Sequence, residues 1–314
     1  MRIGLVLSGG GANGAFEAGV VAAIEEAGIR PTILSGTSAG ALNVAAMAHG
    51  LDADALAELW RSTGPGDVYR LRRDIWRALR PTAWLTGGGL AGRALGSIGW
   101  TWLLDTAPLR RTLIEALGGE HLEVADELTV SVSAVDKPTG ELVRFTNRLP
   151  PEHRRAPSYR QVQLGVEHLL ASAAIPLAFR PAEHDGTRWW DGGLVANTPL
   201  APAMAHEPDT VIVVTTSTRQ RPAPQPESLA DTIGLLIDNL LGHSLAADLK
   251  HARLINELCR ADRERRDRRE VDLLVIEPEG LDLGGSLDFS AELARRRLEL
   301  GREVGARELA AWGA

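Results

Sequence analysis

The chain has 314 residues, a formal net charge of −7 with its histidines neutral, and one cysteine, Cys259. Its length and apolar content are sufficient for a large core, so we expect it to fold without a partner. The negative charge argues against nucleic-acid binding through a broad basic surface, although it leaves a local basic patch open. A single cysteine excludes an internal disulfide bond and suits a reducing compartment, so we expect a cytoplasmic protein.

The first predicted element is a buried strand, the apolar run at residues 3–7. With one positive charge and five apolar residues, this region is too short for the core of a signal peptide. A glycine-rich loop follows and leads into a helix whose inward face carries Phe16, Val20 and Ile24. The backbone N–H groups of such a loop can converge on one point, where they bind negative charge.

Two chemistries compete for this glycine loop. Gly9, Gly11 and Gly14 have the GxGxxG spacing of a phosphate- or dinucleotide-binding loop. A dinucleotide site expects an acidic residue after a second strand, whereas residues 25–26 lie within the first helix. A P-loop expects lysine after the last glycine, where Ala15 stands. The other use is an oxyanion hole, which requires a nucleophile nearby.

The stretch LSGTSAGALNV places Ser38 between Gly36 and Gly40. A predicted strand at residues 31–36, a sharp turn and a helix from Ala39 form the context of a nucleophile elbow. The two glycines remove side chains where strand and helix approach, so the serine can adopt a strained backbone with its hydroxyl projecting from the sheet. The spacing also arises by chance, and Ser38 is then an ordinary polar residue in a turn.

Residues 82–104 are rich in glycine and tryptophan and contain Arg93. This composition predicts an irregular loop packed on the domain, and we expect no membrane-spanning helix here or elsewhere. The alternative is a segment that covers an apolar pocket or lies at a lipid surface, because indole combines a large apolar ring with one polar N–H.

Short apolar runs predict further strands at residues 128–135, 142–146, 210–216 and 271–278. Amphipathic segments lie between most of them. This alternation predicts the α/β class, with a largely parallel central sheet covered on both faces by helices. In such a sheet the reactive loops gather at the carboxyl ends of the strands.

The stretch RWWDGGLVANTPL places Asp191 after a strand-like segment and before Gly192 and Gly193. A tight turn there would leave the carboxylate at the mouth of the sheet, where it can accept the proton of Ser38 directly. Two alternatives stay open: one of the eight histidines completes a Ser-His-Asp triad, or Asp191 only caps its turn. None of the histidines follows the late strand-to-loop pattern of an α/β-hydrolase histidine.

Three segments near the C-terminus have structural interpretations. Residues 229–241 predict an amphipathic helix, and the mixed charges of residues 262–269 predict a solvated face. The segment from Asp288 onward predicts a helix with four inward residues: Phe289, Leu293, Leu300 and Val304.

Three of these stretches together resemble the patatin-like phospholipase family. SGGGANG resembles its oxyanion loop, GTSAG its nucleophile elbow and DGGLVANTP its DGG motif, in the order that the family shows. Residues 171–181 resemble the segment that usually precedes the DGG motif, so the resemblance spans about residues 3–215. It implies a three-layer α/β/α fold. We expect one domain over residues 1–314, with a Trp/Gly-rich cap or loop insertion at about 70–105 and a C-terminal helical segment at about 286–312.

The resemblance also implies a site. Ser38 and Asp191 would form a catalytic dyad without a histidine, metal or cofactor, and backbone amides of three glycines would form the oxyanion hole: Gly9, Gly10 and Gly11. The other motif glycines would support these loops: Gly14, Gly36, Gly40, Gly192 and Gly193. One position departs from the family, because Asn13 stands where arginine or lysine is common. Asn197 and Pro199 would shape the DGG loop.

The implied activity is that of a serine acyl hydrolase, a lipid esterase or phospholipase A-type enzyme that forms an acyl-enzyme intermediate. Its substrate would be a fatty-acyl ester or a phospholipid, and any membrane contact would be peripheral. Two alternatives stay open: a non-catalytic protein that binds an anionic ligand in the glycine loop, and a Ser-His-Asp esterase.

Overall fold

The structure is a computed structural model that describes residues 1–72, 102–217, 250, 253–254, 256–257, 260 and 270–313. Several sequence predictions lie outside these residues. They are most of the tryptophan- and glycine-rich insertion, the amphipathic helix at 229–241 and the charged run at 262–269.

A mixed sheet forms the centre of the molecule, with the strand order β12-β11-β1-β2-β5-β10-β9. Its parallel part consists of five strands: β12 (Asp272–Ile276), β11 (Thr210–Val214), β1 (Ile3–Leu7), β2 (Ile33–Thr37) and β5 (Thr129–Asp136). These strands are rich in valine, isoleucine and leucine, as expected of strands buried on both faces. The predicted α/β class with a largely parallel sheet is therefore confirmed.

The other strands of this sheet were less visible in the sequence. β10 (Thr187–Asp191) pairs antiparallel with β5 and with β9 (Ala182–His184). β6 (Leu142–Thr146), which the sequence predicted, branches from β5, and β7 (Tyr159–Gln161) pairs with β6. The three-residue strands carry almost no period-2 signal, which explains why they were not predicted.

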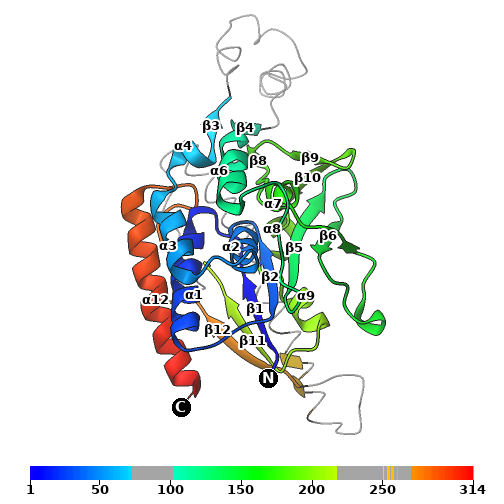
Figure 1. Cartoon of the computed structure of the whole chain (residues 1–314), viewed down its shortest axis with the longest axis vertical. Coiled ribbons are helices and arrows are strands. Elements are labelled where there is room, and N and C mark those ends of the chain that lie inside the picture. Colours follow the sequence, from blue (N-terminus) through cyan, green and yellow to red (C-terminus); the bar gives the residue numbers. More distant parts are fainter. Residues whose placement is uncertain are drawn as a thin grey trace, which may run out of the picture.

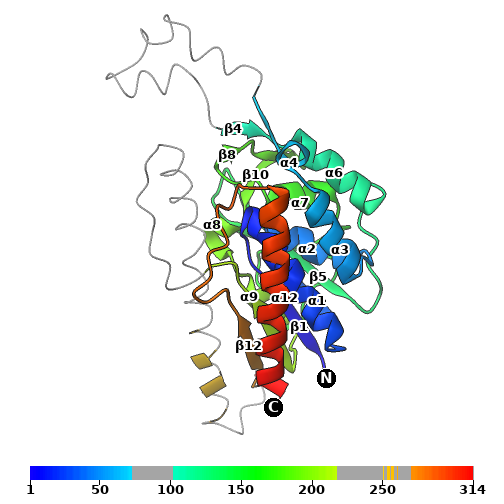
Figure 2. The ribbon, with the colours of Figure 1, turned by 90° about the vertical axis from the view of Figure 1, so that its left-hand side faces the viewer.

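Helices cover both faces of the sheet (Figure 2). On one face lie α1 (Gly14–Glu26), α2 (Ala39–Ala48) and α7 (Val166–Ser172), and their apolar side chains join the main core with Leu5, Leu7 and Ile212. The predicted inward residues of the first helix are buried: Phe16, Val20 and Ile24. The opposite face packs on α9 (Leu200–Ala205), through Leu200 and Ala203 against Val6 and Val213.

The C-terminal helix α12 (Ala291–Gly313) lies alongside α1 (Figure 1). The approach is close, because a Cβ on Gly19 would lie 2.1 Å from the Leu298 carbonyl oxygen, and a Cβ on Gly301 would lie 2.0 Å from that of Phe16. The sequence misjudged part of this contact face. Val304 is buried as expected, whereas Leu293 and Leu300 are only half-buried. Phe289 is buried too, but it precedes the helix, which begins at Ala291 rather than at Asp288. An apolar pattern gives no weight to glycine, which is the residue that lets two helices approach closely.

A smaller sheet stands at the carboxyl-end edge of the main sheet, with two of three further helices beside it, while the third packs along α1 (Figure 1). The sheet consists of β3 (Arg70–Leu71), β4 (Trp102–Asp105) and β8 (Leu177–Phe179). The helices are α3 (Ala53–Ser62), α4 (Pro65–Val68) and α6 (Ala107–Leu117). The short elements η1 (Gly11–Asn13), η4 (Glu152–Arg154) and α8 (Gly193–Ala196) complete the described fold. Over the described ranges no helix is both long and apolar enough to cross a membrane.

Candidate active site

Ser38 occupies the sharp turn between β2 and α2, with φ 53° and ψ −125°. A positive φ is costly for a residue with a Cβ, and such strain is typical of a nucleophile elbow. The two flanking glycines make the turn possible. A Cβ on Gly36 would lie 2.4 Å from the Gly40 carbonyl oxygen, and a Cβ on Gly40 would lie 2.3 Å from that of Leu7. The geometry expected of this turn is therefore present.

The register of the sheet brings Asp191 to the same place. Thr37, directly before the serine, pairs with Ser133 on β5, and Asp191 pairs with the next residue on that strand, Ala134. The backbone N–H of Asp191 also donates to the Ala174 carbonyl oxygen, at 2.9 Å. β10 and β2 flank β5, and the register places Asp191 beside Ser38 at the end of these strands, although the two residues are far apart in sequence.

The Asp191 carboxyl is fully buried, and burial raises its pKa to about 7. The Ser38 side chain interacts with the carboxyl and lowers its pKa, as does the hydrogen bond of 2.7 Å from the Gly193 N–H to Oδ1. The second oxygen, Oδ2, has no hydrogen-bond partner within the described part of the chain. A carboxyl with a pKa near neutrality beside a serine can exchange a proton with that serine.

The glycine loop between β1 and α1 lies beside Ser38. Its backbone is fixed at both ends, because the Gly9 N–H donates to the Asn197 carbonyl oxygen at 2.9 Å and the Ala12 N–H donates to that of Ser286 at 2.7 Å. Between them, the N–H groups of Gly10 and Gly11 have no acceptor among the described residues. Gly11 has φ 56°, a conformation that favours glycine.

An apolar cavity opens from this corner. Ser38 and Gly11 line it together with side chains of the surrounding helices, of the smaller sheet and of the segment before α12, which include Leu42, Trp60, Leu113, Leu169, Phe179 and Phe289. Gly14 lets the Trp60 ring pack closely against the start of α1, because a Cβ at Gly14 would lie 2.7 Å from this ring. A cavity with one polar corner and apolar walls suits a ligand with an apolar chain and one reactive polar group.

Sequence reasoning missed Ser172, at the end of α7. Its Oγ accepts a hydrogen bond of 2.9 Å from the backbone N–H of Ser38. The residue lies within the ASAAIP stretch, so the resemblance pointed to the segment without showing that this side chain touches the elbow.

Sequence reasoning also missed Glu17, which is fully buried in α1. Its oxygens contact Ser8 Oγ at 3.2 Å and accept from Asn43 Nδ2 at 3.1 Å, while Asn43 Oδ1 accepts from Trp60 Nε1 at 2.8 Å. Burial raises the pKa of Glu17 well above its ordinary value, while the hydrogen bonds from Asn43 and Ser8 lower it. Glu17 directly follows Phe16, which faces inward, so its position in the helix could have predicted a buried carboxyl.

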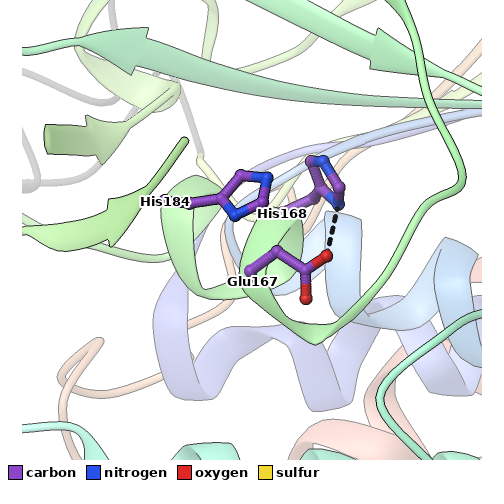
Figure 3. Close-up of side chains that lie close together, drawn as sticks. All are labelled: Glu167, His168 and His184. Atoms are coloured by element: carbon purple, nitrogen blue, oxygen red, sulfur yellow. Dashed lines mark ion pairs between the residues drawn. The ribbon is translucent and has the colours of Figure 1, made fainter. Parts of the chain in front are cut away.

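The described histidines take no part in this site, since none of them is hydrogen-bonded to Ser38 or Asp191. One pair lies close together, with Glu167 beside it: ligand atoms of Glu167, His168 and His184 lie within 4.8 Å of one another (Figure 3). His168 Nδ1 accepts the Gly165 N–H at 3.2 Å, which caps α7 and leaves the ring proton on Nε2. The neutral ring has no lone pair left for a metal ion, so we assign His168 to the helix cap.

Comparison with known proteins decides the family. A sequence model of the patatin-like phospholipase family matches residues 5–204, more than half of the chain. The chain belongs to the patatin-like phospholipase family. The matched range contains the glycine loop, the elbow and the DGG motif of this patatin-like protein, whereas α12 and the segment before it lie beyond the match.

Three curated relatives are similar to this patatin-like chain. It is 54% identical over 77 residues to lysophospholipase nte1 of Aspergillus terreus, a match that covers 23% of this chain and 5% of the relative. It is 32% identical over 217 residues to an uncharacterized NTE family protein of Mycobacterium tuberculosis, and this match covers 68% of this chain and 30% of the relative. It is 26% identical over 215 residues to lysophospholipase NTE1 of Saccharomyces cerevisiae, and this match covers 68% of this chain and 10% of the relative. The matches thus span less than a third of each relative.

Two solved structures are similar at low sequence identity. VipD from Legionella pneumophila aligns with a TM-score of 0.48 and 16% identity, covering 99% of this chain and 67% of that one. The type III effector protein ExoU aligns with a TM-score of 0.41 and 18% identity, covering 99% of this chain and 53% of that one.

Proposed function

We propose that this patatin-like protein is a serine acyl hydrolase that cleaves fatty-acyl esters, in the manner of a lipid esterase or phospholipase A. The observation that carries the proposal is the buried carboxyl of Asp191, with a pKa of about 7, in contact with the serine of a strained elbow at the polar corner of an apolar cavity. Family membership and the lysophospholipase names of two relatives support a lipid substrate.

The proposed reaction uses both side chains and the glycine loop. Asp191 accepts the hydroxyl proton of Ser38, and the serine oxygen attacks the ester carbonyl. The backbone N–H groups of Gly10 and Gly11 donate to the oxyanion, while the acyl chain lies in the apolar cavity. The alcohol leaves with the proton from Asp191. Water then attacks the acyl-enzyme and gives a proton to Asp191. The bond between Ser38 Oγ and the acyl carbon breaks, the proton returns from Asp191 to Ser38, and the free fatty acid is released.

Covalent labelling tests this function. A fluorophosphonate ester should attach to wild-type Ser38 and add its mass once, whereas Ser38→Ala should stay unlabelled and Asp191→Asn should react much more slowly. Ser62→Ala, which removes an exposed hydroxyl on α3, is the matched control and should label like the wild type. A folded wild-type protein that stays unlabelled would instead support a non-catalytic binding site for an anionic ligand.

A second measurement narrows the substrate. Release of fatty acid from phospholipid vesicles, compared with hydrolysis of a soluble short-chain ester, separates a phospholipase from a general esterase. We expect vesicle substrate to be cleaved through peripheral contact, with the acyl chain entering the cavity. Hydrolysis of the soluble ester alone would limit the function to a general esterase.

A further inference from the structure

The carbonyl oxygen of Gly9 receives an unusual number of hydrogen bonds. Thr216 Oγ1–H donates to it at 2.9 Å and Asn197 Nδ2–H at 3.2 Å, and Ser8 Oγ lies 3.2 Å away. All three side chains are buried. A carbonyl oxygen has two lone pairs, so this acceptor is fully used by protein donors.

Thr216 is held firmly in this position. It follows β11, the parallel neighbour of β1, so its side chain comes from the same sheet edge as the glycine loop. Its backbone N–H donates to Ser8 Oγ at 3.0 Å. The residue also lies directly behind Gly10, because a Cβ on Gly10 would lie 2.2 Å from Thr216 Oγ1. The Thr216 side chain is therefore packed closely against the glycine loop.

The Gly9 carbonyl belongs to the same planar peptide unit as the Gly10 N–H. A hydrogen bond accepted by the carbonyl withdraws electron density through the amide and makes the N–H at the other end a stronger donor. The Gly10 N–H has no acceptor among the described residues, so this added donor strength is available to a ligand. We infer that Thr216 is a positioning residue of the oxyanion hole: its hydroxyl polarises the Gly9–Gly10 peptide and thereby strengthens the Gly10 N–H toward the oxyanion. This inference rests on the proposed function.

Thr216 tests the inference better than Asn197, because its hydroxyl can be removed with almost no change of shape. Thr216→Val replaces the hydroxyl with a methyl group, and Thr216→Ser keeps the hydroxyl while losing the methyl group. A merely structural role would depend on volume, so it would be affected by the serine variant and hardly by the valine variant. Polarisation of the peptide depends on the hydroxyl, so it would be affected by valine alone.

The experiment measures steady-state hydrolysis of a soluble ester and the ¹⁵N resonance of the Gly10 amide in the full chain. In Thr216→Val we expect kcat to fall by about 3- to 10-fold with KM unchanged, since one oxyanion donor is weakened rather than lost. The Gly10 nitrogen should move upfield, because the preceding carbonyl loses a donor. Thr216→Ser should keep both the rate and the resonance of the wild type.

Several results would overturn the inference. An unchanged kcat and Gly10 resonance in Thr216→Val would remove any role for the hydroxyl. A loss of kcat in the serine variant as large as, or larger than, that in the valine variant would assign Thr216 to packing. In both cases wild-type labelling at Ser38 would leave the proposed function standing. A wild-type protein without fluorophosphonate labelling or ester hydrolysis would overturn the proposed function together with the inference.

Discussion

The backbone N–H of Ser38 donates a hydrogen bond of 2.9 Å to the side-chain oxygen of Ser172, which lies 134 positions later in the chain. Both residues are buried. Because Ser172 ends α7, the bond fixes the strained elbow to a helix of the main core. The orientation of the Ser38 side chain thus depends on a second, separate segment.

Replacing Ser172 with alanine should therefore affect both stability and turnover. The buried Ser38 N–H would lose its acceptor, which costs about 1–3 kcal/mol of unfolding free energy. Turnover should fall by about tenfold, because small displacements of a nucleophile are costly. Denaturant unfolding and ester hydrolysis measure the two effects, with Ser62→Ala as the control. Wild-type values for both would show that the bond does not hold the elbow.

The pKa of Asp191 predicts how activity depends on pH. A general base works only when deprotonated, and burial raises the pKa of this carboxyl to about 7. The ratio kcat/KM for a soluble ester should therefore rise with pH, be half-maximal near pH 7 and fall about tenfold per pH unit well below that value. A flat profile between about pH 5 and 8 would contradict the assignment of Asp191 as the base.

The same pKa predicts a gain in stability when the carboxylate is removed. The folded-state pKa lies above the ordinary value of 3.8, so folding favours the protonated carboxyl. The unfolding free energy is therefore highest below about pH 4 and decreases as the pH rises through 7. Asp191→Asn should thus be more stable than the wild type at pH 8, by about 1–3 kcal/mol, and equal to it near pH 4. Unfolding curves at the two pH values measure the difference. Asp126→Asn, at an exposed position, should show no such change.

We expect the C-terminal helix to support the glycine loop of the site through Arg297. This buried arginine donates to three carbonyl oxygens, those of Leu283, Gly285 and Asp288, at 2.7–2.9 Å. Burial lowers its pKa to about 10, so it stays charged at neutral pH. The segment that it holds carries Ser286, whose carbonyl oxygen accepts the Ala12 N–H of the glycine loop.

Arg297→Met should lower the unfolding free energy by about 3 kcal/mol, because three buried carbonyl groups lose their donors. It should also reduce kcat, since the glycine loop loses its support. The neighbouring Arg296→Met, at an exposed position on the same helix, is the matched control for denaturant unfolding and turnover. Equal stability of the two variants would show that the segment holds its shape without Arg297.

Much of the fold could be predicted because the relevant signals are local. The apolar runs at residues 3–7 and 210–216 contain β1 and β11, since a buried parallel strand needs a continuous apolar run. The turn at Ser38 was equally visible, because two glycines are needed where strand and helix nearly touch. By contrast, β8 has three residues and pairs with β4, which lies far earlier in the chain. The equally short β9 forms a hairpin with β10 but has too few residues for a clear period-2 signal.

The sequence by itself determined the α/β class, the strained serine turn and the glycine loop, because neighbouring residues impose these features through backbone conformation and hydrophobic period. Only the tertiary structure decided that Asp191 meets Ser38, that Ser172 holds the elbow and that Thr216 lies behind the glycine loop. These contacts join residues more than a hundred positions apart, and they depend on strand register and close packing. Register and packing are set by the whole core, so no short stretch of sequence contains them.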